Sequence, residues 1–175
     1  MKFGKVSRYK VDCVLPDFYA SEGIYLVMQS ECGSPGYPGS PGMQAAGVTA
    51  ASTDPAVATV FATGNATTYG KGVVHIATAG DLAGVDILTG GNVSAGSLPA
   101  IEAEVAVGVP PLQFASQSSV TITAAQGRTI LADMGINVPS TVNLGNTTST
   151  LLDIPKLTTA QVQQFVNAAK NFTGK

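Results

Sequence analysis

The residues from Cys32 to Gly42, "CGSPGYPGSPG", constrain the fold more than any other stretch of this chain. Glycine recurs at every third position and proline precedes each later glycine, so the run forms neither a helix nor an interior strand. Its few triplets are too short for a collagen triple helix, which has no hydrogen bonds within each strand to offset the ordering of the chain. Pro-Gly pairs fit type II turns, and the prolines favour an extended backbone. We therefore expect a semi-rigid connector with hinge positions at Gly33, Pro35, Gly36, Pro38, Gly39, Pro41 and Gly42.

The composition indicates a surface with few charges. Charged residues make up 11% of the 175 residues, against about 25% in an ordinary soluble protein. Small and β-branched residues dominate, and tryptophan is absent. A surface this poor in lysine and glutamate is marginally soluble unless other subunits cover part of it. The composition therefore favours a component of an assembly over a freely diffusing enzyme.

The charges that do occur are unevenly distributed. The first ten residues contain Lys2, Lys5, Arg8 and Lys10 and no acidic residue, whereas between residues 33 and 127 acidic residues outnumber the single cation, Lys71. A basic arm before an acidic body suits docking on an acidic partner surface, and a solvated terminus is the competing interpretation. Cations without arginine clusters or interleaved aromatic residues do not indicate nucleic acid.

No targeting or membrane signal stands out in the sequence. The N-terminus lacks the apolar core of a secretion signal, and no apolar run approaches the length of a membrane span. We therefore expect manufacture in a host cytoplasm without a signal peptide, and no obligatory disulfide between Cys13 and Cys32.

Short apolar runs bounded by glycine, asparagine, aspartate or proline predict strands. Upstream of the connector, "YKVDCVL" and "GIYLVMQ" predict a β-hairpin or two neighbouring strands. The segment "MQAAGVTAASTDP" is expected to be a polar loop. From Val57 onward the predicted strands are "VATVFAT", "GVVHIAT", "VDILTG", "IEAEVAVG" and "SSVTIT". In the fourth of these, the alternation points Ile101, Ala103, Val105 and Val107 inward. Their spacing is typical of an antiparallel sandwich or barrel.

Two capping patterns predict helices in the last third. Thr123 and Gln126 have the spacing of a capping box for a helix over about residues 124–134, and Gly135 suits its left-handed end. Within that helix, Gly127 is expected to cost about 1 kcal/mol relative to alanine. Thr158 and Gln161 repeat the box before a second helix. Its apolar stripe, expected to pack on the protein's own body, consists of Val162, Phe165, Val166, Ala169 and Phe172.

Together these patterns predict a mainly β protein, with an antiparallel sandwich or barrel as its body and one or two C-terminal helices. The expected parts are an N-terminal β arm at 1–31, a connector at 32–56, the β body at 57–122 and a helical part at 123–175 packed on that body.

The sequence contains no strong catalytic or metal-binding motif. One histidine and two separated cysteines cannot supply a structural zinc site, so no metal or cofactor is expected. His75 is expected on the wetter face of a strand. Ser94 lacks the surroundings of a nucleophile elbow. Glu102 and Glu104 share a strand face, where such pairs more often prevent aggregation than act in catalysis. The residues therefore predict a protein that is not an enzyme.

The layout of a basic arm, a Gly-Pro run, a charge-poor β body and a C-terminal helix resembles accessory virion proteins of tailed bacteriophages. The run "GSPGYPGSPG" is similar to the collagen-like triplets of phage fibres and capsid decorations. The resemblance implies a non-enzymatic capsid decoration or head-fibre protein on the virion surface, in contact with capsid proteins or with itself. Docking would involve the N-terminal arm, through Lys2, Lys5, Arg8, Tyr9, Lys10 and Val11.

Other functions stay open at this point. A trimer is expected if the Gly-Pro runs of three chains bundle together. One alternative is a self-polymerising tail-tube, fibre or pilus-type subunit. A second is a carbohydrate-binding or adhesive module, which the absence of tryptophan weakens.

Overall fold

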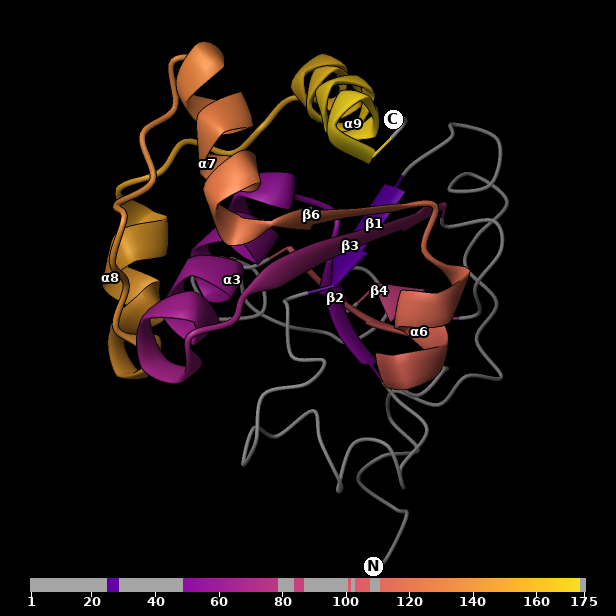
Figure 1. Cartoon of the computed structure of the whole chain (residues 1–175), viewed down its shortest axis with the longest axis horizontal. Coiled ribbons are helices and arrows are strands. Elements are labelled where there is room, and N and C mark those ends of the chain that lie inside the picture. The colour runs from indigo at the N-terminus through magenta and orange to yellow at the C-terminus, as the bar shows by residue number, and fades with distance from the viewer. Residues whose placement is uncertain are drawn as a thin grey trace, which may run out of the picture.

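The structure is a computed structural model that describes residues 25–28, 49–78, 84–86, 101, 103–107 and 111–173 (Figure 1). The expected docking residues between positions 2 and 11 lie outside these ranges, as do the hinge positions between 33 and 42, Cys13 and Cys32.

The strands of the described residues form one antiparallel sheet in the order β4-β5-β2-β1-β3-β6. The central strand β1 pairs with β2 on one side and with β3 on the other, and β6 forms one edge. In chain order the strands are β1 (Tyr25–Met28), β2 (Thr49–Ser52), β3 (Val73–Thr78), β4 (Gly84–Asp86), β5 (Glu104–Val107) and β6 (Val120–Thr123).

Five α-helices accompany this sheet in the described part of the chain. In Figure 1, α3, α7 and α8 lie together beside the sheet, α9 lies next to α7, and α6 lies apart from this group. The helices are α3 (Pro55–Tyr69), α6 (Pro111–Gln117), α7 (Ala124–Asp133), α8 (Thr147–Leu152) and α9 (Thr159–Thr173), with a short 3-10 turn η3 (Leu144–Asn146) before α8.

The expectation of a mainly β sandwich or barrel is wrong. Two of the helices are 15 residues long, whereas no strand of the described chain exceeds six residues. The clearest error concerns "VATVFAT", which was expected to be a strand and lies inside α3. A short apolar run fits a buried strand and a buried helix equally well, because periodicity distinguishes them only when one face is polar.

Helix α3 is buried along most of its length and therefore lacks a polar face. Every residue from Pro55 to Asn65 is buried, and the helix contacts α7, α8 and three strands. Its ends carry local signals: the side chain of Asp54 caps the first turn, Pro55 follows it, and Gly70 closes the helix at a φ of 76°. These signals, rather than periodicity, identify the helix.

A threonine ladder runs along α3 and allows polar residues inside this core. The hydroxyls of Thr59, Thr63 and Thr67 each donate to the main-chain carbonyl four residues earlier, at 2.8 to 2.9 Å. The hydroxyl of Thr63 also accepts from Nη1 of Arg128 at 3.0 Å. Because the buried hydroxyls of Thr59 and Thr63 have partners, their burial does not carry the cost of an unpaired polar group.

Strands β3 and β6 confirm the predicted strands "GVVHIAT" and "SSVTIT". Residues of β6 alternate between buried and exposed. Val74 pairs with Ile122 and Ile76 pairs with Val120, and all four side chains are buried on the same face of the sheet. These side chains pack with α3, α7 and α9 in the main hydrophobic cluster.

Other expected boundaries differ from the structure. The predicted strand "IEAEVAVG" is strand only over Glu104–Val107, because the backbone at Ala103 turns through a positive φ of 45°. The expected polar loop before residue 56 contains β2 and the start of α3. Residues 25–28 of the expected arm lie in the interior of the sheet, and their expected hairpin partner at 9–15 lies outside the described residues.

The capping pattern at Thr123 is confirmed. Thr123 and Gln126 exchange both bonds of the capping box at the start of α7. Gly135 takes a φ of 81°, and the N–H of Ile136 donates to the carbonyl of Leu131 at 2.8 Å, which completes the Schellman ending. Local sequence signals are therefore sufficient to define this helix.

The second capping box, between Thr158 and Gln161, is also present, and α9 begins directly after it. Phe165, Val166 and Ala169 of its apolar stripe are fully buried against β6 and α7, Val162 is half-buried, and Phe172 is 38% exposed.

Candidate functional site

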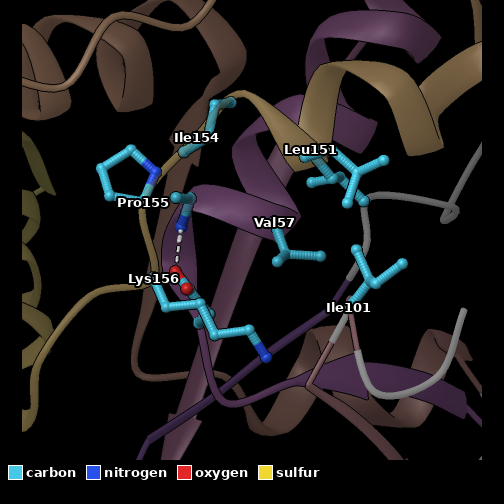
Figure 2. A pocket seen from close by; sticks show the side chains of 9 residues that line it. Val57, Ile101, Leu151, Ile154, Pro155 and Lys156 are labelled. Carbon is cyan, nitrogen blue, oxygen red and sulfur yellow. Dashed lines mark hydrogen bonds between the residues drawn. The ribbon is translucent and has the colours of Figure 1, made fainter. Parts of the chain in front are cut away.

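A partly enclosed hollow lies where the start of α3 meets the turn after α8 (Figure 2). We call it the Asp54 hollow. Its volume is about 170 Å³. Three segments far apart in the sequence provide its lining, which consists of Asp54, Ala56, Val57, Ile101, Leu151, Leu152, Ile154, Pro155 and Lys156. The close-up shows apolar side chains from α3, α8 and the segment around residue 101 pointing into the same space.

Asp54 joins two parts of the chain that form this hollow. Its carboxylate accepts from the N–H of Ala56 at 2.9 Å through Oδ1 and from the N–H of Leu157 at 3.2 Å through Oδ2. Its own N–H donates to Oγ of Ser52. The side chain is only 6% exposed. Asp54 therefore caps α3 and at the same time holds the segment that leads into α9.

Burial raises the pKa of Asp54, while the main-chain donors and the charge of Lys156 act in the opposite direction. Each carboxylate oxygen of Asp54 already accepts from one main-chain N–H group, which leaves fewer acceptor sites for a polar ligand. The remaining walls are almost entirely aliphatic. The chemistry of the hollow suits an apolar group.

The rim of the hollow carries an exposed apolar side chain. Leu152, the last residue of α8, is 67% exposed, more than any other large hydrophobic residue of the described chain. Asp153 and Lys156 follow on the same turn and are exposed too. A second, more open depression of about 470 Å³ shares Ile154 and Pro155 with the first. The turn after α8 thus borders two depressions of the described surface.

His75 is a second buried polar group, and the sequence had singled it out. It lies opposite the exposed Thr121, on the face of β3 away from Val74 and Ile76 as expected, but it is itself only 9% exposed. Helix α6 contacts β3, and this packing could not be read from the alternation in the strand. Burial lowers the pKa of the imidazole, which favours its neutral form.

A chain of hydrogen bonds holds the His75 ring. Nδ1 lies 2.8 Å from Oγ1 of Thr121, which lies 3.3 Å from Oγ of Ser118, and that hydroxyl donates to the carbonyl of Ala115. Since Ser118 uses its proton on the carbonyl, Thr121 donates to Ser118 and accepts from a protonated Nδ1. This series of hydrogen bonds ends at a main-chain carbonyl, so it orients the imidazole ring.

The side chains of the other candidate residues from the sequence lie outside what the structure describes. Ser94 and Glu102 lie outside the described residues, and only the backbone of Glu104 is described, in β5. Within the described ranges, no three residues with histidine, cysteine or carboxylate side chains come together in a way that could hold a metal ion. The helices of those ranges include none that is long and apolar enough to cross a bilayer.

Sequence reasoning missed Asp54 as a site residue. The signal that could have found it is "DP" before an apolar run, since aspartate is a preferred N-cap and proline a preferred first helical residue. No family model, curated protein or solved structure matches this chain, so its function is argued from its own residues.

Proposed function

We propose that this chain is a non-enzymatic structural subunit of a large protein assembly. The observation that supports this most is Leu152, 67% exposed on the rim of the aliphatic Asp54 hollow. Apolar surface of this kind, in a chain with only 11% charged residues, is typical of a protein that other subunits cover.

In its more specific form, the proposal is a capsid decoration or head-fibre protein on the surface of a tailed-bacteriophage virion. The support for this form is the layout of the sequence, with a basic arm at 1–10, a Gly-Pro connector and a charge-poor body. Attachment through many symmetry-related copies would turn weak individual contacts into a stable coat, because multivalent binding multiplies affinity without new contacts.

Copurification tests the proposal. Expressed in its native context with an affinity tag, the chain is expected to sediment with a large particle at a fixed ratio of copies. Isolation only as a free polypeptide, with no particle, would contradict it. Deletion of residues 2–10, which removes Lys2, Lys5, Arg8 and Lys10, is expected to abolish attachment. Attachment that survives the deletion would refute the arm as the docking element.

The self-polymerising subunit is the second candidate, and the low share of charged residues, 11% of the chain, is the observation that favours it. Negative-stain images of the purified chain distinguish the two, because a polymerising subunit gives filaments and a decoration protein gives none.

A further inference from the structure

We propose that the Asp54 hollow is a socket for Leu152 of a second copy of this chain. The inference rests on the proposed function, since it names the partner that covers this part of the surface. In this arrangement two copies meet through the turns that follow α8, and each inserts its leucine into the other. The contact is isologous, so it closes as a pair and does not extend into a filament.

The lining of the hollow determines the class of occupant. Its walls are aliphatic, and the carboxylate of Asp54 already accepts from Ala56 and Leu157. A charged or strongly polar ligand would lose its water shell and find few partners in return. The volume of about 170 Å³ is close to the roughly 150 Å³ of an apolar cavity that holds one benzene molecule. The hollow therefore fits a single aliphatic side chain.

Leu152 is the aliphatic side chain best placed to fill it. It is 67% exposed and lies on the rim, so knob and socket are neighbours on the same surface. A two-fold axis next to this rim brings the knob of each copy to the socket of the other in one step. If the knob lay on a distant face, the same pairing would join copies head to tail.

The charges beside Leu152 complement each other across such an axis. Asp153 and Lys156 are both exposed on the turn after α8 and have opposite sign. When two copies of the turn run antiparallel, Asp153 of each faces Lys156 of the other. Asp153 also lies at the carboxyl end of α8, where the helix dipole disfavours a negative charge. A cation from the second copy offsets that cost.

The first experiment measures self-association of the full chain by sedimentation equilibrium over a series of concentrations. The wild-type chain is expected to form a dimer that dissociates on dilution. Leu152→Lys is expected to raise the dissociation constant by about thirtyfold or more, as for removal of a central anchor. Tyr69→Lys is the matched control, because Tyr69 is 40% exposed and does not line the hollow. It should dimerise like the wild type.

The second experiment uses the charges to test the two-fold arrangement. Asp153→Lys alone places two lysines opposite each other, and Lys156→Asp alone places two aspartates there, so each single variant is expected to be mainly monomeric. In an equimolar mixture, one variant offers two lysines to the two aspartates of the other, and heterodimers should form. Far-UV circular dichroism of each variant checks its fold. If Lys156→Asp unfolds because residue 156 lies close to Asp54, the comparison of Leu152→Lys with Tyr69→Lys still tests the socket.

Three results would overturn the inference: a wild-type chain that is monomeric at every concentration, a Leu152→Lys variant that dimerises normally, and charge variants that pair equally well alone and mixed. None of these bears on copurification with a large particle. The proposed function can therefore be correct even if the Leu152 contact is refuted. Conversely, a chain that dimerises but does not associate with a particle would refute the proposed function and leave the contact supported.

Discussion

Substituting Gly127 by alanine tests how closely α3 and α7 approach each other. A Cβ atom built on Gly127 would lie 2.9 Å from Oγ1 of Thr59 and 3.1 Å from its Cγ2. Thr59 is fully buried, and its hydroxyl donates to the carbonyl of Pro55 at 2.8 Å, so the side chain has no free rotamer into which it could retreat. The two helices must therefore move apart or the threonine must lose its bond.

Two effects of opposite sign determine the outcome. Helix propensity alone favours alanine over glycine by about 1 kcal/mol. An extra carbon in a packed core costs about 1 to 3 kcal/mol, and the disturbed hydroxyl bond adds roughly 1 kcal/mol. We expect a net loss of about 1 to 3 kcal/mol in the free energy of unfolding for Gly127→Ala. For a chain of this size, that corresponds to a fall of about 2 to 12 °C in Tm.

Urea unfolding followed by circular dichroism at 222 nm measures this loss. Thr129 provides the matched control, because it is exposed on the same helix. The difference between Thr129→Ala and Thr129→Gly gives the propensity term without the packing term. In the double variant Thr59→Ala with Gly127→Ala, both close atoms are gone, so most of the loss should be recovered. A Gly127→Ala protein stabilised by the full propensity difference would refute the close approach.

Three further predictions concern buried groups. Asp54→Asn should lower stability by about 1 to 3 kcal/mol at neutral pH, because an amide cannot accept from both main-chain donors. Because the pKa of the Asp54 carboxyl is raised, wild-type stability falls as pH rises from the usual value of 3.8 through the folded-state pKa. Urea titrations at several pH values should find that this slope disappears in Asp54→Asn. The lowered pKa of His75 has the opposite consequence: stability is lost as pH falls from 6.5 through the folded-state pKa, and His75→Gln, which removes the only histidine, should abolish that loss in thermal melts. Gly72→Ala should cost more than about 3 kcal/mol and greatly reduce soluble yield, because a Cβ there would overlap the carbonyl oxygen of Ala62; normal yield and Tm would contradict this.

The parts of the fold that sequence predicts correctly are those determined by neighbouring residues. The capping boxes at Thr123 and Thr158 and the glycine ending at Gly135 each act within a few residues, and the helices begin and end where these signals place them. Strand β6 was predictable for the same reason, since its alternation matches one buried and one exposed face.

Helix α3 was missed because its environment is apolar on almost every side. An amphipathic helix shows its period in the sequence, but a helix covered by α7, α8 and the sheet has no polar stripe to reveal it. The expected cost of Gly127 omits a tertiary contact for a related reason. Its cost was estimated from propensity alone, whereas its contact with Thr59 depends on a tertiary packing of residues 68 positions apart.

The candidate site lies beyond sequence reasoning for the same physical cause. The Asp54 hollow brings together residues near positions 54, 101 and 151–156, and the bond between Asp54 and Leu157 spans 103 residues. No pattern of neighbouring residues in the sequence specifies such a long-range contact. The cap at Asp54 could have been read from its neighbours, but the second donor to its carboxylate could not.

The threonine ladder and the enclosure of α3 have a consequence for how the chain is made. The segment that forms α3 leaves the ribosome well before α7 and α8, which cover it, and Leu157 follows Asp54 by 103 residues. At a synthesis rate of about 5 to 20 residues per second, that delay lasts roughly 5 to 20 seconds. During this time the apolar helix lacks the packing of α7 and α8, although its hydroxyls can already bond within the helix. Nascent chains interrupted before residue 157 should therefore depend on chaperones and aggregate in their absence. The last third of the protein thus protects α3 from aggregation.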